Sequence, residues 1–195
     1  MKKTFKTISK ISLSLLLLSG SIMADDISDT MEDALASYKK GDISGAKEDL
    51  TYVLELLKQK KGDDMKAYLP DALDGWKAED AKSETAGSGM LGGGTTLSRT
   101  YTKDKSRIVI EIVTDSPLLS GLGSMFANPM FSSGGKLKRI NREKAMIKYD
   151  KKREAGDISL MIDKRFMVTV KGSKVTEDEL IEYTRAIDFK ALKKM

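Results

Sequence analysis

The sequence predicts an α+β protein with an N-terminal αα-hairpin, a mostly antiparallel sheet of about six strands, and a C-terminal helix packed on that sheet. Apolar residues recur with helical spacing through residues 27–61. Short alternating runs joined by short turns follow between residues 95 and 171, which favours antiparallel pairing. A capped helix start then closes the chain. We expect a signal peptide over residues 1–24, a helical hairpin over 25–66 and an α+β sheet domain over 67–195.

The first 24 residues have the three parts of a cleavable signal peptide. Lysines without any acid make the positive region, residues 11–18 form the apolar core, and small residues lead to Ala24. A spanning helix needs roughly 20 apolar residues, so this short core favours a cleaved signal, and an uncleaved anchor is the alternative. We expect no transmembrane segment in the mature chain. The pattern predicts cleavage after about Ala24 and export, most simply to a bacterial periplasm.

Composition excludes several kinds of chemistry. The chain has no Cys and no His, so disulfides, thiolate nucleophiles, the usual zinc sites and a Ser-His-Asp triad are impossible. Its formal charge of +5 includes four lysines of the signal peptide, which leaves +1 for the mature chain. Nucleic acid binding needs many cations on one surface, so we expect no nucleic acid partner.

Residues 27–61 predict two antiparallel helices. Gly41 ends the first helix and Asp42 can cap the second, which is expected to end near Gly62. The expected buried faces are Ile27, Met31, Leu35 and Tyr38 in the first helix, and Ala46, Leu50, Val53, Leu54 and Leu57 in the second.

The turn of this hairpin, Ala34-x-x-Ser37-Tyr38-Lys39-Lys40-Gly41-Asp42-x-x-x-Ala46, resembles the turn between the helices of a tetratricopeptide repeat. The match covers about one repeat of roughly 34 residues, and such repeats bury their faces by stacking on neighbours. A single repeat is therefore expected to pack on the rest of the chain, and a peptide-binding repeat is the alternative.

Strand-like runs are expected at residues 95–102, 107–114, 136–141, 144–151, 157–162 and 166–171. Residues 107–114 have Ile108, Ile110 and Ile112 on one face and valines on the other, which is typical of a central strand. A hairpin turn is expected at Asp163 and Lys164. The last helix begins with a capping box formed by Thr176 and Glu179.

The segment 165–172, the capped helix and Ala186-Ile187-Asp188-Phe189 are similar to uncharacterised periplasmic proteins of proteobacteria, as is the passage from Leu69-Pro70 to Trp76. The resemblance covers most of residues 69–192. It implies an exported location and a compact sheet domain, without an activity.

Residues 116–135 contain no formal charge, although 32% of the whole chain is charged. The simplest interpretation is a short helix packed on the sheet with a loose exit loop. The alternatives are an apolar flap over a ligand cleft, or a patch that touches a membrane or a partner. The candidate contact residues are Leu118, Leu119, Leu122, Met125, Phe126, Met130 and Phe131, with Met90 from the glycine-rich run 87–94.

Other functional interpretations have weaker support. Residues 87–94 match G-x-G-x-x-G formally, but a dinucleotide site needs a helix to follow, and a strand is expected here. Methionines suit Cu(I), yet the spacing favours core filling, with Met31 in a helix core. Asp63 and Asp64 are neighbouring acids of the kind used in polysaccharide hydrolysis, without an indicated cleft. The dense basic run over residues 136–153 is expected to be mostly solvated.

The leading functional hypothesis is an exported, non-catalytic binding or accessory protein. We expect no cofactor, no metal and no catalytic residues. The partner is a small apolar ligand, a lipid or an envelope protein. The alternatives are an envelope-associated protein that contacts lipid through the uncharged segment and, less favoured, a carboxylate-based hydrolase.

Overall fold

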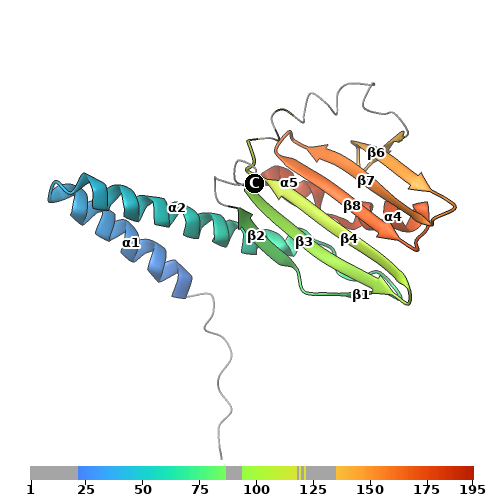
Figure 1. Cartoon of the computed structure of the whole chain (residues 1–195), viewed down its shortest axis with the longest axis horizontal. Coiled ribbons are helices and arrows are strands. Elements are labelled where there is room, and N and C mark those ends of the chain that lie inside the picture. The colour runs from blue at the N-terminus through green and yellow to red at the C-terminus, as the bar shows by residue number, and fades with distance from the viewer. Residues whose placement is uncertain (1–21, 87–93, 118, 120, 122–134) are drawn as a thin grey trace, which may run out of the picture. The chain divides into compact units, whose positions relative to one another are not determined.

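The protein is an α+β structure, as the sequence predicts. A computed structural model describes residues 22–86, 94–117, 119, 121 and 135–195 (Figure 1). The chain divides into two compact units, Met1–Leu54 and Glu55–Met195. The division falls inside the second helix, so the first unit is a helical hairpin and the second contains the sheet.

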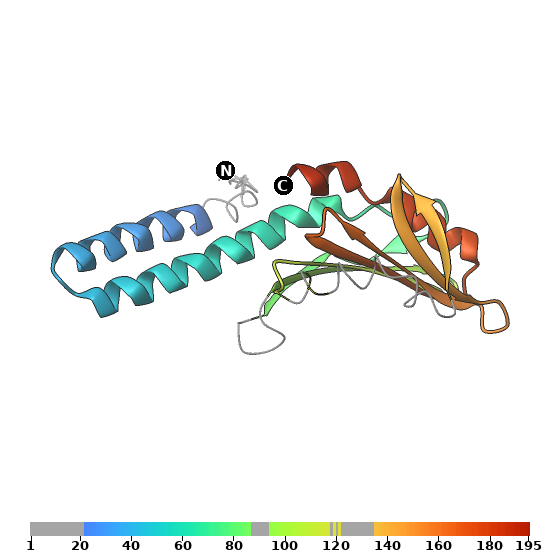
Figure 2. The same cartoon turned by 90° about the horizontal axis from the view of Figure 1, so that it is seen from above.

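The hairpin of the first unit consists of α1 (Ile22–Lys39) and the beginning of α2 (Ile43–Met65), which run side by side (Figures 1 and 2). Gly41 has a φ of +82°, the left-handed conformation that ends a helix most readily when the residue is glycine. Asp42 Oδ1 accepts a hydrogen bond of 2.9 Å from the Gly45 N–H, which caps α2. The predicted Gly-Asp turn is therefore confirmed.

The buried faces expected for this hairpin are partly wrong. Ile27, Ala34, Ala46 and Val53 are buried and form the seam. The larger side chains expected beside them are exposed: Met31, Leu35, Tyr38, Leu50, Leu54 and Leu57. The physical reason is that two helices can bury only a narrow row of each against the other, and small alanines allow a close approach. The rest of the apolar stripe stays exposed among the residues that the structure describes.

The sheet of the second unit has eight strands, and all strand pairs are antiparallel. The strands are β1 (Lys77–Ala78), β2 (Lys82–Ala86), β3 (Gly94–Lys103), β4 (Ser106–Thr114), β5 (Lys136–Ile140), β6 (Glu143–Asp150), β7 (Ala155–Ile162) and β8 (Phe166–Ser173). Six of them match the expected runs. The two additional strands, β1 and β2, are short and lack alternating apolar residues. The turn at the end of residues 69–76 leads into β1, as the sequence indicates, whereas β2 was not expected.

The strand order is β1-β3-β4-β8-β7-β6-β5, with β2 also paired to β3. β1 and β2 follow one another along the same outer edge of β3, since β1 pairs at Tyr101 and Thr102 while β2 pairs over residues 94–98. β4 is an interior strand between β3 and β8, as its two apolar faces predict. Both predicted hairpin-turn residues, Asp163 and Lys164, have positive φ values of 51° and 54°.

One face of the sheet carries the core. Its centre consists of side chains with no measurable exposure, contributed by adjacent strands: Ile108, Ile110, Ile112, Ile158, Leu160, Ile162, Phe166, Val168 and Val170. The helices α4 (Glu177–Ala186) and α5 (Phe189–Lys194) and the short η1 (Lys66–Tyr68) contact this unit's sheet or each other, and Figure 2 shows α4 and α5 on one side of it. The opposite face has half-buried side chains in the same strands.

The C-terminal helix begins as predicted. The Thr176 hydroxyl accepts a hydrogen bond from the Glu179 N–H, and the Glu179 carboxylate accepts one from the Thr176 N–H. Leu180 packs close above the strand: a methyl group at Gly172 would lie 2.7 Å from Leu180 Cδ2 and 2.5 Å from Val175 Cγ2. The absence of a side chain at Gly172 therefore allows α4 to approach β8 closely.

The expected end of the second helix at Gly62 is wrong, because α2 continues to Met65. Gly62 is buried, and a methyl group built on it would lie 2.1 Å from Ser83 Oγ and 3.0 Å from Thr95 Cγ2. The glycine thus allows the helix to pack closely on β2 and β3. Met65, three residues later, is fully buried in the core.

The close packing at Gly62 predicts whether an alanine at this position raises or lowers the free energy of unfolding. An alanine in place of a helical glycine ordinarily stabilises by about 1 kcal/mol. At residue 62 we expect Gly62→Ala instead to lower the free energy of unfolding by about 1 kcal/mol, because overpacking costs roughly 1–3 kcal/mol. Urea denaturation measures the change. The double variant Gly62→Ala/Ser83→Gly should recover stability, and a stabilised single variant would contradict close packing at this position.

Candidate interaction surface

Most residues that the sequence singled out for ligand or partner contact lie outside the described residues. These are Leu118, Leu122, Met125, Phe126, Met130, Phe131 and Met90. Leu119 is described, and it is 5% exposed with its N–H bonded to the Ser116 carbonyl oxygen at 3.0 Å. Contact through this segment stays a prediction.

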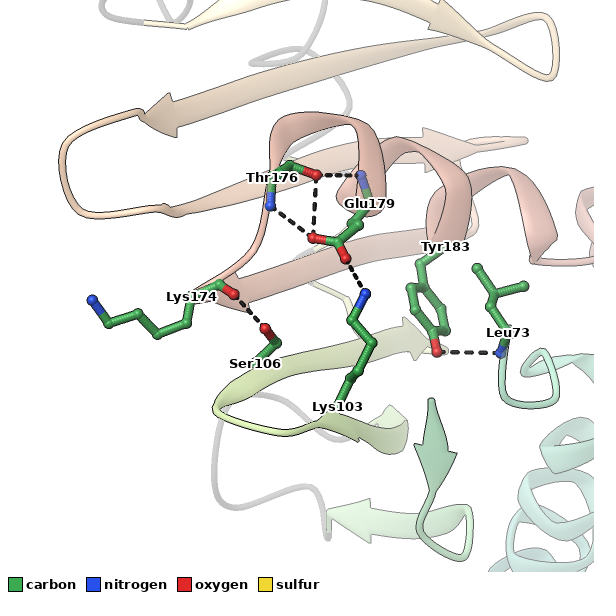
Figure 3. A network of polar contacts seen from close by, with 7 residues as sticks. All are labelled: Leu73, Lys103, Ser106, Lys174, Thr176, Glu179 and Tyr183. Carbon is green, nitrogen blue, oxygen red and sulfur yellow. Dashed lines mark hydrogen bonds and ion pairs between the residues drawn. The ribbon is translucent and has the colours of Figure 1, made fainter. Parts of the chain in front are cut away.

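Polar and aromatic contacts at one end of α4 join three parts of the second unit. Tyr183 of α4 is fully buried, with its ring centroid 5.2 Å from that of Trp76 and 4.5 Å from that of Tyr101. The Leu73 N–H donates a hydrogen bond of 3.3 Å to the Tyr183 hydroxyl (Figure 3). The helix, β3 and the turn over residues 72–76 therefore meet at one side chain.

An ion pair borders this aromatic cluster. Lys103 Nζ lies 2.5 Å from Glu179 Oε1 and 4.9 Å from the centroid of the Trp76 ring (Figure 3). Figure 3 also shows Glu179 turned toward both Lys103 and Thr176, so one carboxylate completes the helix cap and the ion pair. The arrangement fixes the first turn of α4 to the end of β3.

The electrostatics of the cluster indicate a structural role. Burial disfavours the charge on Glu179, but hydrogen bonds from Lys103 and from Thr176 outweigh it and hold the pKa of Glu179 below its ordinary value. Burial raises the pKa of Tyr101 and of Tyr183 above that of a free phenol. At neutral pH the Glu179 carboxylate is charged and the phenols of Tyr101 and Tyr183 are neutral. The pKa shifts move all three groups away from neutral pH, where a general acid or base would titrate.

A groove of about 640 Å³ opens beside the cluster, between the turn over residues 72–76 and α4. Its lining includes Trp76 and a mixture of charged side chains: Asp74, Lys103, Glu179, Glu182 and Arg185. A second hollow of about 550 Å³ is lined by Asn141, Arg142, residues 187–190 and Lys193. In the described part of the chain, no group of three or more Asp or Glu side chains has the arrangement needed to hold a metal ion.

The most distinctive surface of the molecule belongs to the hairpin. Seven large apolar side chains of the first unit are between 43% and 65% exposed. Tyr52 lies on another side of α2, and we call the other six the hairpin apolar face: Met31, Leu35, Tyr38, Ile43, Leu50 and Leu54. Monomeric proteins expose single apolar residues routinely, but rarely a continuous group of this size.

Helix geometry places the six residues on one side of the hairpin. In α1, Leu35 directly follows the seam residue Ala34, and in α2, Leu54 directly follows the seam residue Val53. Met31, Tyr38 and Leu50 each follow a seam residue by four positions. The exposed rows are thus rotated from their seams by about 40–100° in the same sense along the chain. Because the two helices are antiparallel and face one another, equal rotations bring both rows to the same side.

The helical spacing of apolar residues in the sequence identified this surface, but we expected these residues to be buried, and they are exposed. The spacing of Met31, Leu35 and Tyr38 correctly placed them on one face of a helix. Burial depends on a covering layer, which periodicity alone does not specify. The tertiary fold brings together Trp76, Lys103 and Glu179, which are distant in the sequence. Of the contacts in this cluster, the sequence predicted only the capping box of Thr176 and Glu179.

Comparison with protein-family models, curated proteins and solved structures gave no match. No helix in the described ranges combines the length and apolar character needed to cross a membrane.

The depressed pKa of Glu179 predicts a pH dependence of stability. A carboxyl group whose pKa is lower in the folded state stabilises the fold above its unfolded pKa, near 4.3, and this contribution is lost as the pH falls through the folded value. We expect Glu179→Gln to lower the free energy of unfolding by about 1 kcal/mol at pH 7, with the difference from wild type shrinking toward zero at acidic pH.

Urea denaturation at pH 7 and at successively lower pH measures this difference. The matched control is Glu182→Gln, on the exposed side of the same helix, which should change stability little. A Glu179→Gln effect that stays constant with pH would show that the charge of Glu179 contributes nothing to the contact.

Proposed function

We propose that this chain is an exported, non-catalytic binding or accessory protein that acts through protein contact made by the hairpin apolar face. The observation that carries the proposal is the exposure of six large apolar side chains on one side of a two-helix unit. Covering such a surface removes apolar area from water, which is the main driving force of association. A helical face of this kind typically receives another helix.

Charge supports contact at this side of the hairpin. The acids Asp29, Asp33 and Glu48 lie about half a turn away from the exposed rows. Charged residues are depleted from the centres of protein interfaces, and this separation keeps these three acids away from the apolar rows, whereas Lys47 lies between Ile43 and Leu50 in the α2 row. The second unit supplies a scaffold whose α4 is held by the Lys103–Glu179 pair and the Tyr183 cluster.

Export rests on the N-terminal pattern and on the resemblance to uncharacterised periplasmic proteins of proteobacteria. Removal of residues 1–24 would leave Asp25 and Asp26 in the first turn of α1. Contact with lipid through residues 118–131 stays a prediction from the sequence.

Processing provides a direct test of export. We expect the protein recovered from a bacterial periplasm to begin at Asp25, which intact-mass measurement and N-terminal sequencing identify. Leu16→Arg interrupts the apolar core of the signal and should leave the full-length chain in the cytoplasm. A full-length chain in the periplasmic fraction of wild-type cells would contradict cleavage, and exclusive recovery from the cytoplasm would contradict export.

Site-specific photo-cross-linking tests the contact surface. We expect a photoreactive phenylalanine analogue at Leu50 to give a discrete cross-linked product in cells, because this position lies in the hairpin apolar face. The same analogue at Tyr52, which is 56% exposed on another side of α2, is the matched control and should give little product. Equal yields from the two positions, or none from either, would refute contact through this face.

A further inference from the structure

We propose that the outer end of the sheet, formed by β5 and β6, binds the surface of a membrane that contains anionic phospholipids. These two strands form the end of the sheet opposite to β1 and β3 (Figure 1). The inference goes beyond the proposed function, because it concerns the second unit and uses no residue of the hairpin apolar face. It rests on exposed cations and one exposed leucine that the strand register places on the same face.

Positive charge is concentrated in these two strands and in the turn that follows them. Residues 136–153 contain nine Lys or Arg and only two acids, a net charge of +7. Both acids already have a cationic partner, since Glu143 pairs with Lys193 and Asp150 lies 3.6 Å from Arg153 Nε. Seven of the nine cations make no ion pair with another described residue.

The strand register places three of these cations on one face of the sheet. Ala145 and Ile147 of β6 are buried in the core, and side chains alternate along a strand, so Lys144 and Lys148 point to the opposite face. Arg139 of β5 is directly opposite Lys144, and residues paired in this way share a face. All three cations are exposed.

A strongly exposed leucine lies among these cations. Leu137 is 61% exposed, the highest value for a large apolar side chain among the described residues of the second unit. It precedes Arg139 by two residues on β5, so it points to the same face, and its cross-strand partner is Met146. We call this surface the basic patch: Leu137, Arg139, Lys144 and Lys148.

The pair of Arg139 and Lys144 favours binding of an anion. Like charges directly opposite on neighbouring strands are destabilising, and neither side chain makes an ion pair with another described residue. The acids that β5, β6 and β7 place on this face are Asp157, the cross-strand partner of Lys148, and Asp150, at the far end of β6. An external anion beside Arg139 and Lys144 would therefore relieve a repulsion that the protein itself leaves in place.

Protection of the sheet edge does not account for the whole patch. Cations on an outer strand oppose its pairing with other molecules, which is reason enough for Arg139 on β5. Lys144 and Lys148 belong to β6, which is already paired on both sides, with β5 and with β7. Their charges are a property of the sheet face and not of its edge.

The combination of separated cations and an apolar side chain fits a membrane surface. Lys144 and Lys148 are four residues apart, about 13 Å along the strand, so the charges do not converge on one small ion. The headgroups of an anionic bilayer present negative charge over an area, and each nearby Lys or Arg adds to the attraction. Leu137 can enter the boundary between headgroups and acyl chains. A purely acidic polypeptide would satisfy the cations and leave Leu137 in water, so the membrane accounts for both features.

Co-sedimentation of the protein, purified after export, with phospholipid vesicles tests the proposal. We expect binding to phosphatidylcholine vesicles that contain about 30% phosphatidylglycerol, and no binding to phosphatidylcholine alone. Because the attraction is electrostatic, binding should weaken at least about tenfold when NaCl is raised from about 0.05 M to about 0.5 M.

Neutral replacements separate the basic patch from the general charge of the protein. Arg139→Gln/Lys144→Gln should lower the vesicle partition coefficient at least about tenfold, because each Lys or Arg near an anionic surface contributes about fivefold. The same variant should be at least as stable in urea as wild type, because it removes a like-charge pair. The matched control, Lys190→Gln/Lys194→Gln, removes the same charge from exposed positions of α5, on the other side of the sheet (Figure 2), and should lower the coefficient less than about twofold.

A leucine replacement tests the apolar part of the contact. Leu137→Ser should weaken vesicle binding about threefold or more, and the ratio to wild type should persist at high salt, because burial of apolar area is not screened. Leu50→Ser is the matched replacement in the hairpin apolar face and should leave vesicle binding unchanged. This pair of variants keeps the membrane contact distinguishable from the proposed protein contact.

Several outcomes overturn the proposal. Absence of binding to the anionic vesicles at about 1 mM lipid and low ionic strength is one, and equal binding to phosphatidylcholine alone is another. An unchanged partition coefficient in Arg139→Gln/Lys144→Gln excludes the basic patch as the contact. Binding of polyglutamate without binding of vesicles would assign the patch to an acidic protein, and loss of vesicle binding in Leu50→Ser but not in Leu137→Ser would place the lipid contact on the hairpin apolar face.

Discussion

The buried ring of Tyr183 is the contact on which the arrangement of the second unit depends. It touches Trp76 and Tyr101 and accepts a hydrogen bond from the Leu73 N–H, so three segments distant in sequence are held at one point. The Lys103–Glu179 pair and the Thr176 cap fix the first turn of the same helix, one turn before Tyr183. With α4 held by these neighbouring contacts, the apolar face of the sheet is covered, and Gly172 allows the close approach that this covering requires.

The sheet unit could be predicted from the sequence to a large extent because its signals are local. Alternation placed Ile108, Ile110 and Ile112 on the buried face, and the Thr176–Glu179 spacing located the start of α4. The strands β1 and β2 were not predictable in this way, because they pair along an edge and bury few side chains. Gly62 shows a second limit: close approach between distant segments and a helix end both favour glycine, and the sequence alone does not distinguish them.

The candidate surface shows a third limit of sequence reasoning. Helical spacing correctly grouped Met31, Leu35 and Tyr38, but an apolar row can face the protein's own core or another molecule. The seam of the hairpin uses Ala34 and Ala46, which bring the helices together without filling a wide interface. The larger side chains are therefore not needed to hold the two helices to each other, and their exposure is a property of the whole hairpin rather than of any single residue.

The outer strand β5 has a consequence for the behaviour of the protein at high concentration. It lies at the end of the strand order, and Lys136, Lys138 and Arg139 are all exposed on it. If identical molecules joined edge to edge through this strand, cations would accumulate at a spacing of about 4.8 Å, and their mutual repulsion would oppose fibril growth. Among the described strands, β5 pairs on one side only, and these cations oppose pairing of its outer edge with a strand of another molecule.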